Sequence, residues 1–257
     1  MQGVPAARAG HRPVAHPASR RVATVATVCG RFVSVSTAAQ LQERFAVDEV
    51  RTEPLPERYN VAPSSDVYSI IERDGTRRLG TLRWGFVPHF TEQLKGARTP
   101  INARLETVHT SKMFARAFEK RRCLLPADGF YEWQKREDGT KQPYHLHARD
   151  DGPFAFGGIW TVWRDPAQGE DADPLFSTAI VTTAADGELT RIHERVPLIV
   201  PQRLWQDWLT ATPDEAPHLH RAVSSLGAPA LVAEPISDRV NNVRNEGPQL
   251  VVPLDAA

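Results

Sequence analysis

The segment CLLPADGFYEWQKREDGTKQPYHLHARDDGPFAFGGIWTVW, residues 123–163, decides the fold class. Its runs of aromatic and branched side chains are separated by Asp-Gly pairs at 138–139 and 151–152. Asp-Gly readily adopts the left-handed backbone of tight turns, so it separates strands rather than continuing a helix. The segment therefore predicts a series of strands, at Cys123–Leu125, Phe130–Gln134, Tyr144–Ala148 and Phe154–Trp163.

The flanking sequence adds more strands and several helices. Val67–Ile71 and Arg77–Trp84 flank another Asp-Gly pair at 74–75, which predicts a hairpin, and Thr178–Thr183 predicts a further strand. Helices are predicted from Ser36, with Leu41 and Phe45 on one face, from Ser111, with Met113, Phe114 and Phe118 apolar, and at Asp186–His193 and Pro201–Leu209. Strands and helices do not alternate strictly. We therefore expect a single α+β domain with a curled, barrel-like, mainly antiparallel sheet and peripheral helices.

The composition is that of a globular protein. Of the 257 residues, 41% are hydrophobic and 24% are charged, which is enough apolar material for a full core. The two cysteines, Cys29 and Cys123, form no C-x-x-C pair, so neither a disulfide framework nor a structural zinc site is expected. No apolar run reaches the roughly 18 residues that a membrane span needs. We expect a cytoplasmic monomer that needs neither a metal nor a cofactor.

The first 28 residues differ from the rest of the chain. They contain four arginines and no acidic residue, whereas residues 29–257 contain 27 basic and 31 acidic residues, a net charge of −4. They also lack the hydrophobic core of a secretory signal. We interpret residues 1–28 as a disordered or non-native extension, either a misassigned start or a removed leader, and residues 29–257 as the domain. One hypothesis is that Val28 is encoded by GTG and is the true initiator, which would leave Cys29 first once methionine is removed.

One stretch of the domain is strongly basic although the domain as a whole is acidic. Only Glu106 and Glu119 offset its basic residues, which are Lys95, Arg98, Arg104, Lys112, Arg116, Lys120, Arg121 and Arg122. A local basic surface can bind phosphates even on an acidic protein. A solvated face with no ligand would give the same pattern, and charge alone does not separate the two.

Four residues are candidates for chemistry: Cys29, Asn102, Glu132 and His193. Glu132 lies on the same face of its predicted strand as Phe130. If this face is turned to the core, burial raises the pKa of the carboxyl group and fits it for proton transfer near neutral pH. If Tyr131 and Trp133 are the buried pair instead, Glu132 lies in water. The sequence leaves both orientations open.

A series of motifs gives these candidates a context, because the chain resembles the abasic-site processing proteins, also called SOS-response-associated peptidases. The matching segments are CGRF at 29–32, RYNVAP at 58–63, RWGFVP at 83–88, INARLET at 101–107, SKMF at 111–114, ADGFYEW at 127–133, IHERVP at 192–197 and NNVRNEG at 241–247. The resemblance runs from Cys29 nearly to Leu254.

The resemblance implies a specific covalent reaction. In that family the cysteine is the mature N-terminus, and its amine and thiol form a thiazolidine with the aldehyde of an abasic site in single-stranded DNA. By this analogy Glu132 handles protons on the amine, His193 assists opening of the sugar or loss of water, and Asn102 positions the amine and the sugar. An internal cysteine cannot react in this way, because its nitrogen is an amide.

The same matches imply a set of DNA contacts. Phosphate-binding roles would belong to Arg31, Arg104, Lys112 and Arg195, and Asn60 would line the pocket. His89-Phe90 occupies a site where family members have tryptophan, so we expect weaker or different base stacking there.

Three other functions compete with this one. An N-terminal-nucleophile amidotransferase also begins Cys-Gly, but it needs a glutamine-binding set that we do not find. A cysteine peptidase could use Cys29 and His193, and self-cleavage before Cys29 would remove a leader once. A plain nucleic-acid binding module would have no covalent step at all.

Overall fold

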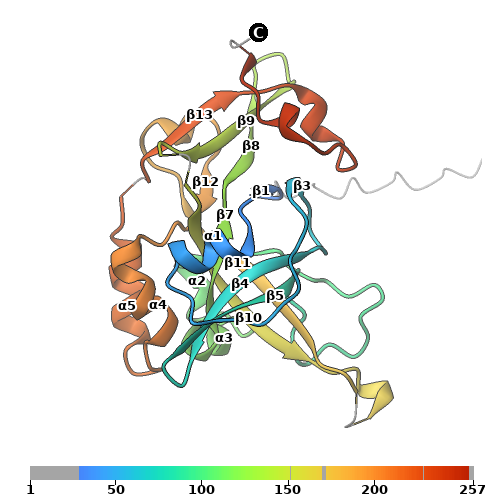
Figure 1. The fold of residues 1–257 in the computed structure, drawn as a ribbon, viewed down its shortest axis with the longest axis vertical. Helices are drawn as coiled ribbons and strands as arrows, with labels where there is room; N and C mark the ends of the chain where they lie inside the picture. The colour runs from blue at the N-terminus through green and yellow to red at the C-terminus, as the bar shows by residue number, and fades with distance from the viewer. Residues whose placement is uncertain (1–28, 151, 170–171, 228, 255–257) are drawn as a thin grey trace, which may run out of the picture.

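The structure, a computed structural model, describes residues 29–150, 152–169, 172–227 and 229–254. Its larger sheet contains, in spatial order, β12 (Arg195–Pro197), β11 (Leu175–Ala184), β10 (Phe154–Trp163), β7 (Arg122–Ala127), β4 (Asp66–Arg73), β5 (Thr76–Trp84) and β2 (Glu49–Val50). β11 also pairs with β5 in parallel, with Thr178 opposite Trp84, and this pairing closes the sheet into a ring (Figure 1). The short strand β6 (Asn102–Arg104) extends β11 on its other side.

A smaller sheet stands at one end of the ring (Figure 1). Its order is β13 (Leu231–Pro235), β9 (Lys141–Ala148), β8 (Gly129–Lys135), β1 (Phe32–Ser34) and β3 (Arg58–Val61). β7 and β8 are separated only by Asp128, whose carboxylate accepts hydrogen bonds from the backbone N–H groups of Val35 at 2.7 Å and Ser36 at 3.0 Å. Asp128 therefore fixes the segment that follows β1 beside β8.

The α-helices cover the outside of the ring, whereas two 3-10 helices near the C-terminal end lie against the smaller sheet. The α-helices are α1 (Ala38–Arg44), α2 (Leu105–Val108), α3 (Ala115–Lys120), α4 (Trp205–Thr210) and α5 (Ala216–Ser224), and the 3-10 helices are η1 (Pro166–Gln168), η2 (Gly187–Arg191), η3 (Gln202–Leu204), η4 (Asp238–Asn241) and η5 (Pro248–Leu250). α4 and α5 lie together against one side of the ring (Figure 1). Trp208 of α4 is fully buried, and its indole N–H donates to the carbonyl of Cys123 at 2.8 Å. No helix among the described residues is long and apolar enough to span a membrane.

Two large apolar clusters follow from this arrangement. One lies between the helices and the ring and includes Phe45, Phe118 and Trp208. The other lies on the opposite face of the ring strands, where the rings of Phe32 and Trp84 meet edge to face at 5.3 Å. Cys29 belongs to this second cluster and is completely buried. The first residue that the structure describes is therefore part of the core.

The predicted fold class is confirmed, and several element boundaries need correction. The hairpin forms as β4 and β5, with Asp74 at φ 54° and Gly75 at φ 71° in its turn, and the strand Phe154–Trp163 has the predicted bounds. The N-cap of α1 is Thr37 rather than Ser36, because the Ser36 hydroxyl is used by Asp128. The predicted extension at 1–28 and the turn residue at 151 lie outside the described residues.

Three of the predicted helices also differ in type or length. The segment predicted from Ser111 becomes helical only at Ala115. The predicted helix Asp186–His193 is the 3-10 helix η2, in which the Asp186 carboxylate accepts from the N–H of Gly187 at 2.7 Å. The predicted helix Pro201–Leu209 is split into η3 and α4. Short segments gain few hydrogen bonds after the costly first helical turn, so their helices are easily shortened or replaced by 3-10 turns.

Candidate active site

Cys29 and Glu132 are in direct contact. The backbone nitrogen of Cys29 donates to Oε1 of Glu132 at 2.6 Å, and the Glu132 side chain is only 2% exposed. The contact follows from strand register, because β1 pairs with β8 with Phe32 opposite Phe130, and the N–H of Tyr131 donates to the carbonyl of Arg31. This register brings Cys29, three positions before Phe32, beside Glu132, two positions after Phe130.

The structure decides which way Glu132 faces. Phe130 is fully buried in the same cluster as Cys29, with its ring 5.8 Å from that of Phe156, and Glu132 lies on this face of β8. Tyr131, on the opposite face, is also fully buried, against Val33 and Ile236. Both faces of β8 are thus covered, and the carboxyl group is held in an apolar setting.

Burial changes the acid–base properties of the pair. Desolvation raises the pKa of Glu132 to about 8, although hydrogen bonds from the backbone of Cys29 and Trp133 and the charge of Lys141 act in the other direction. Burial, and then the Glu132 charge, also raise the pKa of the Cys29 thiol well above its ordinary value. A carboxyl group with a pKa near 8, in contact with a nitrogen, can give or take a proton at neutral pH.

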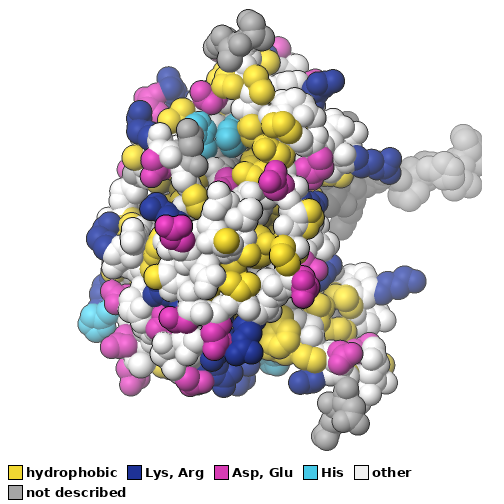
Figure 2. Space-filling model, viewed as in Figure 1, with side chains coloured by type: hydrophobic (Ala, Val, Ile, Leu, Met, Phe, Trp, Pro, Cys, Tyr) yellow, Lys and Arg dark blue, Asp and Glu magenta, His cyan; other side chains and the backbone are white. Residues whose placement is uncertain are grey.

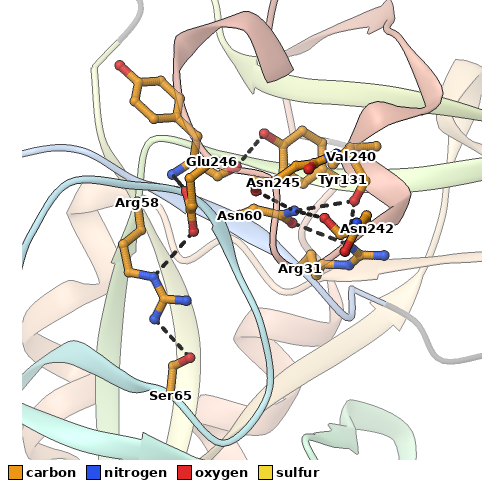
Figure 3. A network of polar contacts seen from close by, with 10 residues as sticks. Arg31, Arg58, Asn60, Ser65, Tyr131, Val240, Asn242, Asn245 and Glu246 are labelled. Atoms are coloured by element: carbon orange, nitrogen blue, oxygen red, sulfur yellow. Dashed lines mark hydrogen bonds and ion pairs between the residues drawn. The ribbon is translucent and has the colours of Figure 1, made fainter.

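Asn60 holds the C-terminal segment in place (Figure 3). The fully buried amide nitrogen of Asn60 donates to the carbonyls of Val240 at 3.3 Å, Asn242 at 3.1 Å and Asn245 at 3.1 Å. Its amide oxygen accepts from Arg31 at 3.4 Å. The amide of Asn60 is therefore engaged with the protein's own backbone.

Arg31 is fixed by the same segment. Its guanidinium donates to the carbonyl of Val240 and to that of Asn241 at 3.1 Å, and it lies 5.1 Å from the ring centre of Trp133. The Trp133 indole N–H in turn donates to Oδ1 of Asn241 at 2.7 Å. Burial lowers the pKa of Arg31 from its usual value. The Arg31 guanidinium thus has a fixed position, two residues along the chain from Cys29.

A pocket opens beside these residues. It has a volume of about 450 Å³ and is lined by Gly30, Arg31, Pro63, Trp133, Lys141 and Asn241. Trp133, Lys141 and Asn241 were not predicted as site residues from the sequence. Trp133 and Asn241 lie in the motifs ADGFYEW and NNVRNEG, which was an available signal, whereas Lys141 lies in no motif. A hollow of about 570 Å³ between α4 and α5 is lined by none of the candidate residues.

Asn102 and His193 lie at the edge of the cluster that contains Cys29. Asn102 begins β6 opposite Ile180, a member of that cluster, and it follows Ile101, which packs against it. His193 follows Ile192, which packs there too, and its Nδ1 accepts from the N–H of Arg195 at 3.1 Å. The structure therefore joins Cys29 and Glu132 directly and places the other two candidates on adjoining segments.

The four arginines and lysines expected at DNA have different environments. Arg104 and Lys112 are exposed. Arg195 is only 12% exposed, and its guanidinium makes two parallel bonds to Glu106, at 3.0 and 2.9 Å, and one to the carbonyl of Thr182. Burial tends to raise the pKa of Glu106, but the hydrogen bond and charge of Arg195, together with backbone hydrogen bonds, leave this pKa below its ordinary value. Arg195 therefore already has an anionic partner, Glu106. Arg104 and Lys112 are not paired with Glu106.

Most of the basic stretch is at the surface, with one exception. Lys95, Arg98, Arg116 and Lys120 are exposed. Arg122 is buried, and its guanidinium donates to the carbonyls of Trp208 at 2.6 Å, Phe118 and Ala211. Arg122 is therefore not part of any basic surface, and it anchors α4 instead.

Two aromatic side chains stand out on the loop between β5 and β6. His89 and Phe90 are both exposed, Phe90 by 59%, and their rings lie 5.4 Å apart. The loop is attached through Thr91, whose carbonyl accepts from the indole N–H of Trp163 at 2.7 Å. An exposed aromatic ring on an anchored loop is a surface on which a base can stack.

Proteins similar to this chain carry a common description. Abasic site processing protein YoqW of Bacillus subtilis is 32% identical over 229 residues, covering 87% of this chain and 99% of that protein. Abasic site processing protein YedK of Escherichia coli is 33% identical over 234 residues, covering 88% of this chain and all of that protein. A protein of Bacteroides thetaiotaomicron has a similar crystal structure, with a TM-score of 0.74 and 21% identity, covering 88% of this chain and 99% of that one.

The similarity extends to a family model. The model described as SOS response associated peptidase (SRAP) matches residues 28–243, which include Cys29, Asn102, Glu132 and His193. The match covers most of the chain and begins next to the buried Cys29. The chain therefore belongs to the SOS response associated peptidase family.

Proposed function

We propose that this protein binds single-stranded DNA and forms a thiazolidine with the aldehyde of an abasic site, through the amine and the thiol of Cys29. The observation that carries the proposal is the 2.6 Å contact between the Cys29 nitrogen and the buried carboxyl group of Glu132. The relatives described as abasic site processing proteins support the choice of substrate.

The reaction requires a free amine on Cys29, so we propose that residues 29–257 are the active domain and that residues 1–28 are absent from the reactive form. The family match begins at residue 28, which supports this boundary. Cys29 also has φ 42°, in the left-handed region that costs energy for a residue other than glycine. Freeing its nitrogen from the peptide bond would relieve that strain.

The first half of the reaction forms an imine. The Cys29 amine, whose reference pKa is about 8, attacks the carbon of the ring-opened aldehyde and gives a carbinolamine. Glu132 has a pKa near the same value, so it can take the proton that the amine loses and return it to the departing hydroxyl as water. His193 assists sugar opening or loss of water, and Asn102 positions the sugar.

The second half closes the ring. The Cys29 sulfur adds to the imine carbon and forms the carbon–sulfur bond, while the thiol proton ends on the ring nitrogen. The result is a five-membered ring of sulfur, Cβ, Cα, nitrogen and the former aldehyde carbon, with one water released overall. The buried thiol is neutral at rest because its pKa is raised, so it becomes reactive when a cationic imine forms beside it.

The DNA strand would be held by charge and stacking near this centre. The exposed Arg104 and Lys112 would contact phosphates, the fixed Arg31 would face the pocket, and Phe90 would stack on a base. Arg195 would act through its pairing with Glu106, by fixing β12 and the adjoining His193 segment.

The proposal is tested with a fluorescent single-stranded oligonucleotide that carries one abasic site. Protein that begins at Cys29 should give an adduct that survives denaturing electrophoresis without borohydride, and Cys29→Ala in the same chain should give none. Cys123→Ala is the matched control, because Cys123 is the other buried cysteine and has no free amine, and it should still form the adduct. Protein that keeps residues 1–28 intact should not react.

Two outcomes would contradict the proposal. One is full adduct formation by protein whose intact mass still includes residues 1–28, and the other is no adduct from protein with a confirmed free Cys29. The intact mass of full-length Cys29→Ala then separates the routes to that N-terminus. Self-cleavage needs the Cys29 thiol. If Cys29→Ala protein has still lost residues 1–28, self-cleavage did not remove them.

A further inference from the structure

A second cluster of polar side chains lies on the smaller sheet, on the face opposite Glu132. His145 and His147 alternate along β9 and so share one face, and Glu234 on β13 lies directly across from His145. Figure 2 shows histidine side chains at the surface where β9 and β13 lie. Among the described residues, these three are the one group of His, Cys, Asp and Glu whose potential ligand atoms all lie within 4.8 Å of one another.

The hydrogen bonds of His147 direct one of its nitrogens at Glu234. Nδ1 of His147 lies 2.9 Å from the carbonyl oxygen of Ala148, which can only accept, so Nδ1 must carry the hydrogen. Nε2 then points at Oε2 of Glu234 at 3.3 Å. With neutral imidazole, a lone pair faces a carboxylate oxygen, and either a proton on Nε2 or a cation between the two atoms relieves this contact. A backbone carbonyl on the remote nitrogen is the usual support of a metal-binding histidine.

His145 provides a second, independent observation. The residue is 8% exposed, and its Nε2 is buried without a hydrogen-bond partner. A buried ring nitrogen in that state costs free energy, so such atoms need an explanation. An ion pair between His147 and Glu234 explains two of the three residues and leaves this nitrogen unexplained.

The spacing of the group suits a transition metal. Tetrahedral ligands at 2.0–2.2 Å from zinc lie about 3.4 Å from one another, close to the 3.3 Å between His147 and Glu234. The rings of His145 and His147 are stacked at 5.0 Å with 12° between their planes, so both can turn an edge to the same side. Gly129 leaves room for this arrangement, since a Cβ there would lie 2.2 Å from Nε2 of His145.

We infer that His145, His147 and Glu234 bind a divalent transition-metal ion of the zinc type, with a fourth position left to water. Two imidazoles and one carboxylate are a ligand set that zinc accepts, and such sets leave one position open. The site joins β9 to β13. β13 leads into the segment from Val240 to Asn245 that surrounds Arg31 and Asn60, so a bound ion would stabilise that segment as well.

The inference is tested by titrating zinc into chelator-treated full-length protein and measuring the heat of binding. We expect one high-affinity zinc per chain, whose binding is weakened in His147→Ala and in Glu234→Gln by at least the 10–100-fold that loss of a supporting group costs. His218→Ala is the matched control, because His218 is exposed on α5 and should leave binding unchanged. Cobalt in place of zinc should give the visible absorption of a tetrahedral site, and this absorption should be lost in the same two variants.

Unchanged affinity and stoichiometry in both site variants would overturn the inference, as would the absence of both heat and a cobalt band at metal concentrations well above that of the protein. Circular dichroism shows whether each variant folds. If His147→Ala does not, Glu234→Gln still decides the question, since the Glu234 side chain is 35% exposed and its replacement leaves the core intact. Crosslinking to abasic DNA is not part of the readout, so the two proposals fail independently.

Discussion

Glu132 couples the stability of the protein to pH, because its carboxyl group is buried where the charged form is poorly solvated. The pKa of Glu132 is about 8 in the folded chain, against an ordinary value of 4.5 for an exposed glutamate. Between pH 4.5 and pH 8 the folded state therefore holds a proton that the unfolded state has released. The contribution of Glu132 to the free energy of unfolding therefore falls as the pH rises from 4.5 to about 8. One pKa unit corresponds to about 1.4 kcal/mol, which makes the full effect a few kcal/mol.

Glu132→Gln should remove this dependence. The amide oxygen of glutamine can still accept from the Cys29 nitrogen, but the side chain no longer titrates. Denaturant unfolding of the full-length chain at pH 5 and at pH 8 should show a smaller loss of stability in the variant than in the parent, and a more stable variant at pH 8. Glu92→Gln, at an exposed position, should follow the parent. Parallel curves for parent and Glu132→Gln would contradict the assigned pKa.

Asn60 illustrates a residue whose polarity matters more than its size. Asn60→Asp replaces an N–H donor that serves three backbone carbonyls with an oxygen that repels them. We expect a loss of stability of about 2–4 kcal/mol and faster amide hydrogen exchange in the segment from Val240 to Asn245. Asn241→Asp is the control, since its oxygen accepts from Trp133 and aspartate can still do so. Equal exchange in the two variants would show that Asn60 does not hold the segment.

At the scale of elements, a single guanidinium fixes α4 against the ring. Arg122→Leu keeps the bulk of the side chain but leaves the carbonyls of Trp208, Phe118 and Ala211 without their donor. Loss of charged hydrogen bonds in a buried place should cost about 3 kcal/mol or more. Thermal unfolding measures this, with Arg116→Leu as the exposed control that should change little. A small effect at Arg122 would mean that α4 is held by packing alone.

Elements defined by local chemistry could be predicted from the sequence. Asp74-Gly75 specifies a turn by its own backbone preference, and the alternating run Phe154–Trp163 specifies a strand wherever it is placed. Short helices could not be placed as well, because the group that starts each one is chosen by its neighbours. Ser36 is a good N-cap in isolation, but Asp128 engages its hydroxyl, and so Thr37 caps α1.

The candidate site shows the same division. The motifs identified Cys29 and Glu132, but their contact depends on the pairing of β1 with β8, which brings together residues 103 positions apart. The partner of Arg195, Glu106, lies 89 positions away and has no local signal. His145 and His147 form an H-x-H pair that is visible in the sequence, yet their third member, Glu234, becomes a neighbour only through β13. Long-range pairing was thus the part that the sequence did not reveal.

The whole molecule is a closed ring with a smaller sheet at one end, and its charge is unevenly distributed. Closure through β11 and β5 leaves the central strands of the ring paired on both sides, so these strands offer no free backbone edge to a ligand. Residues 29–257 have a net charge of −4, which opposes general attraction to DNA. For the proposed binding of a single strand, affinity would therefore depend on local exposed cations such as Arg104 and Lys112.

If binding depends on local cations, it should respond to salt in a defined way. Each phosphate contact on a single strand contributes about 0.7 to the slope of log affinity against log salt concentration. Arg104→Ala with Lys112→Ala should therefore weaken binding to an oligonucleotide without an abasic site and should flatten the slope by about 1.4. Arg203→Ala with Arg221→Ala removes the same total charge from exposed positions elsewhere and should leave the slope unchanged. Fluorescence anisotropy across a salt series measures both. If the two double variants change the slope equally, net charge rather than a localised surface governs the interaction with DNA.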